Sequence, residues 1–158
     1  MDANAGDVRA NQFSQGYLVR SLPRAFAYIA VYALTIGLAS LLWQHPVTLT
    51  LTYALLSAVL LWRWHSFPDV LFFALPAILG PLGEFVAISF GAWEYSLPLL
   101  NIPLWLPLAW GISALCMKKI ADVLMEARAA EAHNNSLERT GDAAAEARAN
   151  LDSGSSRR

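Results

Sequence analysis

The feature that most constrains this chain is a central stretch, from Ala25 to Met117, that is almost free of charge. Of the 23 Asp, Glu, Lys and Arg residues, five precede it, fourteen follow it, and four lie inside it: Arg63, Asp69, Glu84 and Glu94. A water-soluble fold needs polar side chains over its whole surface, and this stretch has too few to cover one. Together with a mean hydropathy of +0.42, it predicts an all-α protein: a four-helix transmembrane bundle with disordered termini.

Four apolar runs in this stretch approach the roughly 20 residues that a helix needs to cross a bilayer. We predict membrane-spanning helices at residues 25–43, 48–62, 69–92 and 103–117, within a transmembrane domain of residues 25–119. Ser66 is placed to cap the third helix, and Asp69 in its first turn favours the helix dipole. An alternative is that residues 97–108 lie flat on the membrane surface.

The positions of lysine and arginine predict the orientation, because cytoplasmic loops retain them. In a four-span topology, one side of the membrane receives all the positive charges flanking the spans: Arg9, Arg20, Arg24, Arg63, Lys118, Lys119 and Arg128. We therefore expect a multi-pass protein of the bacterial inner membrane with both termini in the cytoplasm. Five of the six tryptophans lie near predicted helix ends, where the headgroups anchor amphipathic rings.

The two ends of the chain are polar. Residues 1–24 and 134–158 contain few large apolar side chains and are predicted to be mostly disordered, whereas 120–133 continue the last helix into the cytoplasm. Residues 134–141 read NNSLERTG and resemble the translated ends of bacterial integron gene cassettes. That resemblance implies a mobile bacterial gene whose tail is translated incidentally.

Several classes of site are not supported by the sequence. The net charge is −1 and there is no basic block, which argues against nucleic-acid binding. Three histidines lie in loops and the tail without a second ligand at metal spacing, so neither a metal nor another cofactor is predicted. The single cysteine, Cys116, is interpreted as a small apolar side chain.

Glu84 is the residue that a purely apolar span explains least well. An acid in the middle of a span costs roughly 2.5–3.5 kcal/mol unless it is paired, solvated or protonated. One face of its helix carries small residues at spacings of three and four, and we predict that this face packs against another helix or a second copy of the chain. The members of the face are Ala77, Gly80, Glu84, Ala87 and Gly91.

Other helices offer partners for this acid at comparable depth. Thr35, Tyr53 and Trp105 lie within about two helical turns of the depth of Glu84, so one internal polar cluster is geometrically possible. Pro76 and Pro81 predict a kink just before the acid. Glu84 is the candidate catalytic acid, and the candidate substrate-binding residues are Tyr53, Trp93, Tyr95 and Trp105.

The most distinctive block of the sequence follows Glu84. It reads Gly83-Glu84, then Gly91-x-Trp93-x-Tyr95-Ser96, then Ile102-Pro103-x-Trp105-Leu106-Pro107. This block resembles small bacterial membrane proteins of unknown function. It is also similar to the carotenoid hydratase family, in which an intramembrane Glu precedes a Tyr-Ser turn and a proline-rich run, and more faintly to the Insig sterol-regulatory membrane proteins. Both of these families have more than four spans. The hydratase resemblance implies an isoprenoid-type lipid near Glu84, with the acid as proton donor.

Three functions are compatible with these features. The first is a packing or interaction module that associates with the lipid bilayer and forms a homo-oligomer through the small-residue face. The second is a membrane enzyme or binder for an apolar lipid or isoprenoid that uses Glu84 as an acid. The third is a small proton-coupled carrier that acts as a dimer.

Overall fold

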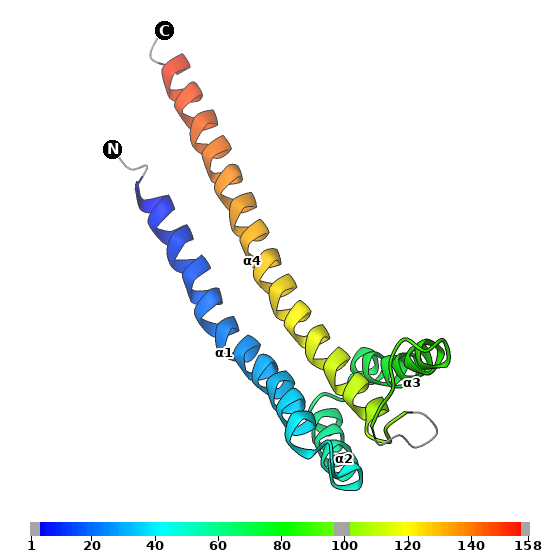
Figure 1. Ribbon diagram of the computed structural model, residues 1–158. Coiled ribbons are helices and arrows are strands. Elements are labelled where there is room, and N and C mark those ends of the chain that lie inside the picture. Colours follow the sequence, from blue (N-terminus) through cyan, green and yellow to red (C-terminus); the bar gives the residue numbers. More distant parts are fainter. Residues whose placement is uncertain (1–3, 97–101, 156–158) are drawn as a thin grey trace. The chain divides into compact units, whose positions relative to one another are not determined.

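The computed structural model describes residues 4–96 and 102–155 of the chain (Figure 1). In this part the fold is all-α, as predicted, with four helices and no strand. The helices are α1 (Asn4–Leu42), α2 (Pro46–Arg63), α3 (Phe67–Ser89) and α4 (Leu106–Ser155). The chain forms two compact units. One is Ala25–Ala121, and the other consists of the described residues up to Arg24 together with those from Asp122 onward.

Three of the helical segments are long and apolar enough to cross a membrane. They are Ser21–Leu42, Pro46–Arg63 and Phe67–Ser89, which agree with the first three predicted spans to within a few residues. The fourth predicted span differs, because α4 begins at Leu106 and reaches Lys118 after twelve residues, a rise of only about 18 Å. It then continues without a break through residues 120–133.

Local sequence sets the start and end of α3. The Ser66 hydroxyl accepts a hydrogen bond from the backbone N–H of Asp69 at 3.3 Å, which confirms the predicted cap. The helix continues through Pro76 and Pro81 and ends at Ser89. Gly91 follows in a left-handed conformation (φ 76°) that residues with a Cβ rarely adopt, and this turns the chain out of the helix.

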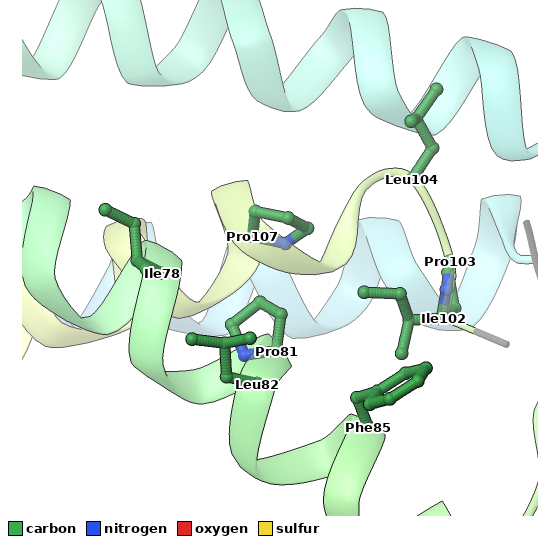
Figure 2. A pocket seen from close by; sticks show the side chains of 8 residues that line it. All are labelled: Ile78, Pro81, Leu82, Phe85, Ile102, Pro103, Leu104 and Pro107. Atoms are coloured by element: carbon green, nitrogen blue, oxygen red, sulfur yellow. The ribbon is translucent and has the colours of Figure 1, made fainter. Parts of the chain in front are cut away.

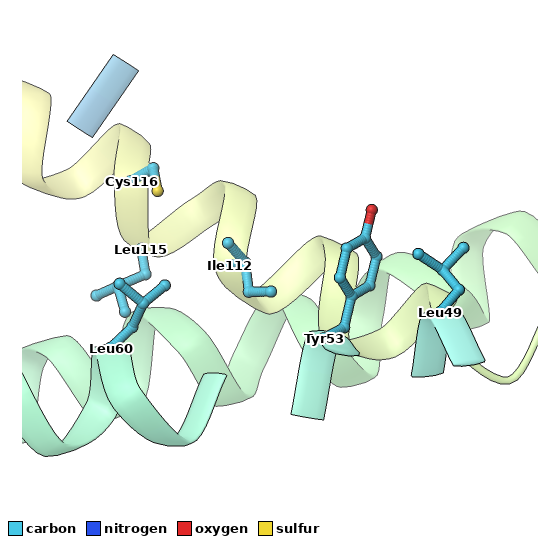
Figure 3. Packing of buried hydrophobic residues seen from close by; sticks show 6 residues of the cluster. All are labelled: Leu49, Tyr53, Leu60, Ile112, Leu115 and Cys116. Atoms are coloured by element: carbon cyan, nitrogen blue, oxygen red, sulfur yellow. The ribbon is translucent and has the colours of Figure 1, made fainter. Parts of the chain in front are cut away.

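The core of the Ala25–Ala121 unit lies between α2 and α4. One stripe of each helix is fully or almost fully buried: Leu49, Tyr53 and Leu60 on α2, and Ile112, Leu115 and Cys116 on α4 (Figure 3). Residues of α1 pack against the same cluster, including Tyr32 and Leu38, so α1, α2 and α4 share this core. Most large side chains of α3 and of residues 21–42 of α1 remain exposed, as expected for helices that face lipid.

The second unit is a pair of antiparallel helical segments formed by the start of α1 and the end of α4 (Figure 1). Its less exposed positions on α4 recur every three or four residues, at Val123, Ala127, Ala130 and Asn134. Alanine is the strongest helix former, which accounts for a helix over the alanine-rich end of α4. That residues 1–24 and 134–158 are mostly disordered stays a prediction. The prediction for residues 1–3 and 156–158 lies outside the described residues.

Candidate functional site

Both carboxylate oxygens of Glu84 are engaged by donors of the same chain. The Trp110 indole Nε1 on α4 donates to Oε1 at 2.9 Å, and the Tyr95 hydroxyl donates to Oε2. Tyr95 lies in the segment after α3, which the turn at Gly91 directs away from the helix axis. Both partners are neutral donors, so the arrangement fixes the carboxyl in place and does not pair it with a second catalytic base or nucleophile.

The Tyr95 hydroxyl is held in its protonated form. Burial raises its pKa above the usual value, and the hydrogen bond to Glu84 and the charge of that carboxylate raise it further. A protonated tyrosine is a hydrogen-bond donor, which is the role that the geometry gives it.

Close backbone approach brings α3 and α4 together beside this acid. A Cβ added to Gly80 would overlap the indole ring of Trp110, and one added to Gly111 would lie 2.7 Å from the Phe73 ring. Each helix thus supplies a glycine that accommodates an aromatic ring of the other. The small-residue face predicted for a second copy is occupied at Gly80 and Glu84 by the chain's own Trp110.

The predicted substrate-binding residues separate into different places. The Tyr53 hydroxyl donates to the backbone oxygen of Thr35 on α1 at 2.5 Å, and its ring meets Trp105 edge-on, with 6.1 Å between centroids. Trp93 is half exposed in the segment after α3. The structure therefore joins Glu84 to Tyr95 and Tyr53 to Trp105, in two separate contacts.

A second acid, Asp69, forms an ionic cluster with the lysines of α4. Lys119 Nζ lies 2.7 Å from its Oδ2 and Lys118 Nζ lies 3.0 Å from its Oδ1, while the Asp69 side chain is only 3% exposed. Each ammonium also faces an aromatic ring, that of Trp64 at 5.5 Å for Lys119 and that of Phe72 at 5.9 Å for Lys118. This cluster joins the first turn of α3 to the fourth turn of α4.

An apolar pocket lies between α3 and the segment that leads into α4. Its volume is about 520 Å³, and only apolar side chains line it (Figure 2). The lining residues are Ile78, Pro81, Leu82, Phe85, Ile102, Pro103, Leu104 and Pro107. None of the candidate residues from the sequence is among them, because the Glu84 carboxyl points to Trp110 and Tyr95 on a neighbouring face of α3.

Two parts of this arrangement were missed by the sequence interpretation. Trp110 is the one tryptophan away from the predicted helix ends, and an indole N–H inside a membrane needs an acceptor, which was an available signal. The Asp69 cluster also had a signal. The four-span topology puts the start of the third span and the end of the fourth on the same side, so that acid and the lysine pair were candidates for contact.

Among the side chains that the structure describes, those of residues 21–96 and 102–144, no group of three or more His, Cys, Asp or Glu is placed to hold a metal ion. Comparison of the chain with protein-family models, with curated proteins and with solved structures finds no match.

Proposed function

We propose that the chain is an integral membrane protein of the bacterial inner membrane that acts as a packing or interaction module and not as a catalyst. The observation that carries this proposal is the state of Glu84, the acid in the third span, five residues before its Ser89 end. Both of its oxygens bind donors of its own chain, and it does not line the described pocket. A proton donor for a lipid substrate needs a free face toward that substrate.

The contacts between α3 and α4 support a four-span topology within this proposal. On α3, the residues that contact α4 are, in order of decreasing number, Glu84, Gly80, Phe73 and Asp69. Their partners on α4 follow in order of increasing number: Trp110, Gly111 and Lys119. The first part of α4 is therefore antiparallel to α3. The contacts extend over about 22 Å of the length of α3, which is most of the thickness of a hydrocarbon core. The short helix reaches the far surface because lysine side chains extend toward the headgroups.

In this topology, Lys118 and Lys119 lie on the same side of the membrane as Arg63. Arg63 ends α2 only six residues before Asp69, and Asp69 binds both lysines. Positive charge retained in the cytoplasm then gives cytoplasmic N and C termini. Fusions of green fluorescent protein and of alkaline phosphatase to the C-terminus test this: we expect fluorescence and no phosphatase activity, and the reverse pattern contradicts a cytoplasmic end.

Glu84→Gln tests the non-catalytic proposal. Three membrane samples are prepared: from cells that overproduce the wild-type chain, from cells that overproduce the variant, and from cells that overproduce neither. Their lipids and isoprenoids are extracted and compared by mass spectrometry. We expect three identical lipid profiles and equal membrane insertion of both proteins. A lipid product that appears with the wild-type chain and disappears with Glu84→Gln overturns the proposal in favour of lipid chemistry at this acid.

The interaction part of the proposal needs a separate measurement. Single cysteines at exposed α1 and α3 positions, such as Leu34, Ile36 and Leu79, are introduced in a Cys116→Ser background and oxidised in native membranes. We expect a disulfide-linked dimer, or an adduct with another membrane protein, at one of these faces and not at the others. Absence of any adduct at all three faces contradicts an interaction role for them.

A further inference from the structure

The apolar pocket between α3 and residues 102–107 is a second site, separate from the Glu84 contacts. It has two walls: Ile78, Pro81, Leu82 and Phe85 come from α3, and Ile102 lies over the Phe85 ring on the opposite wall (Figure 2). Its volume of about 520 Å³ falls within the range of small-molecule sites.

The walls define the chemistry of an occupant. Three of the eight lining residues are prolines, which have no backbone N–H, and the remaining side chains are Ile, Leu and Phe. A polar ligand group buried there would lack a hydrogen-bond partner among the lining side chains, which is unfavourable. A saturated or unsaturated hydrocarbon chain has no such cost.

The position of the pocket identifies where such a chain comes from. Ile78, Leu82 and Phe85 are also exposed residues of a helix that is apolar enough to span the membrane, so the pocket is continuous with the lipid-facing surface of α3. Pro81 and Phe85 lie eight and four residues before the end of α3, or about 12 Å and 6 Å along its axis. The leaflet at the Ser89 end therefore supplies the chain.

We propose that this pocket binds one acyl chain of a membrane phospholipid, taken from the leaflet at the Ser89 end of α3. The site does not involve Glu84, so it goes beyond the function proposed above and does not depend on it. The headgroup stays at the membrane surface, and selectivity lies in the shape of the hydrocarbon contact.

Photo-crosslinking tests the proposal on the full chain in nanodiscs. The discs contain phosphatidylethanolamine and phosphatidylglycerol with a minor share of phosphatidylcholine that carries a diazirine on one acyl chain. After irradiation, adducts are mapped by mass spectrometry of peptides. We expect the adduct yield at Leu82, Phe85 and Leu104 to exceed that at Leu34 and Ile36, which face lipid on α1, by about tenfold, the ratio that 1.4 kcal/mol of binding free energy gives.

Two variants fill the pocket from opposite walls, and one control does not. Leu82→Trp and Ile102→Trp should each lower the yield at Phe85 about tenfold. Leu79→Trp is the matched control, because Leu79 is 61% exposed on the same helix, compared with 55% for Leu82, and does not line the pocket. It should leave the yield unchanged, as should Glu84→Gln. Helix content by circular dichroism checks that each variant is folded.

Three outcomes overturn the proposal. The first is an equal yield at pocket and α1 positions, which means only bulk lipid contact. The second is an undiminished yield at Phe85 in both pocket-filling variants when these are folded. The third is a loss of yield at Phe85 in the Leu79→Trp control as large as that in Leu82→Trp, which means that the added tryptophan and not occupation of the pocket lowers the yield.

Discussion

The two ends of α3 are attached to α4 by different chemistry. At its start, Asp69 is buried between two lysines, and each carboxylate oxygen faces one ammonium. Near its other end, the half-buried Glu84 accepts hydrogen bonds from two neutral donors, Tyr95 and Trp110. Removal of one partner leaves buried charge at the first end and only an unfilled hydrogen bond at the second. The first end should therefore be far more sensitive to mutation, although Glu84 is the more conspicuous residue in the sequence.

Between the two ends, packing holds the helices together. In a bilayer, lipid chains are as apolar as the side chains, so helix association depends on close contact and hydrogen bonds more than on removal of apolar surface from water. Gly80 against Trp110 and Gly111 against Phe73 provide that contact.

Asp69→Asn should have the largest effect. It keeps the shape of the side chain but leaves Lys118 and Lys119 without the carboxylate between them, and breaking a buried ion pair costs about 3–5 kcal/mol of unfolding free energy. Titration of the detergent-solubilised protein with sodium dodecyl sulfate, followed by circular dichroism, measures this. Glu94→Gln, which changes an exposed acid, is the control and should be neutral.

The same cluster allows a sharper test. Replacing Asp69 by Leu and both lysines by Met removes all three charges together, and such apolar replacements are often neutral or stabilising. We expect this triple variant to recover most of the stability that Asp69→Asn loses. A loss below about 1 kcal/mol in Asp69→Asn itself contradicts the picture of a buried ionic cluster.

Gly80→Ala should have the next largest effect. Its new methyl group meets the Trp110 ring, and overpacking of this kind costs about 1–3 kcal/mol. Gly83→Ala is the matched control on the same helix, because nothing lies within 4 Å of the added Cβ. That control should be neutral or up to about 1 kcal/mol more stable through better helix propensity. Equal behaviour of the two variants in the same denaturation assay contradicts the close contact.

Tyr95→Phe tests the Glu84 end of α3. The loss of one hydrogen bond at a half-exposed site should lower the unfolding free energy by about 1 kcal/mol, clearly less than Asp69→Asn. Because the folded pKa of Tyr95 is raised, the stability from its protonated form is present below the unfolded pKa near 10 and is lost as pH rises through the folded pKa. In an ultraviolet titration, the variant should lack one tyrosine that ionises above pH 10. An unchanged titration curve argues against the assignment.

The smallest effect is expected for an exposed ion pair between α1 and α4. Arg24 Nη2 lies 2.8 Å from Glu126 Oε2, but the two side chains are 51% and 58% exposed. Exposed ion pairs contribute about 0–1 kcal/mol and are screened by salt. Glu126→Gln should therefore change stability by less than 1 kcal/mol, with a still smaller difference at high salt. A loss as large as that of Asp69→Asn would remove the contrast between buried and exposed pairs.

Much of the fold was predictable because it depends on local patterns. Apolar runs bounded by Pro46 or by Ser66 define helices by length and capping, and their bounds differ from the observed helices by a few residues. The fourth segment was predicted less well. Its apolar part contains few helical residues before Lys118, and the partner of the two lysines, Asp69, lies about 50 residues earlier in the chain.

The candidate site, like the fold, was predictable from the sequence only in part. The sequence by itself determined that the chain is helical, that it contains segments apolar enough for a membrane, and that Glu84 needs partners inside one, because these follow from composition, helix periodicity and the cost of an isolated acid. Only the tertiary structure decided which donors satisfy it. Tyr95 and Trp110 reach Glu84, and Tyr53 does not, because partner choice depends on which faces of α3 and α4 meet at Gly80 and Gly111, a long-range packing result that no local pattern encodes.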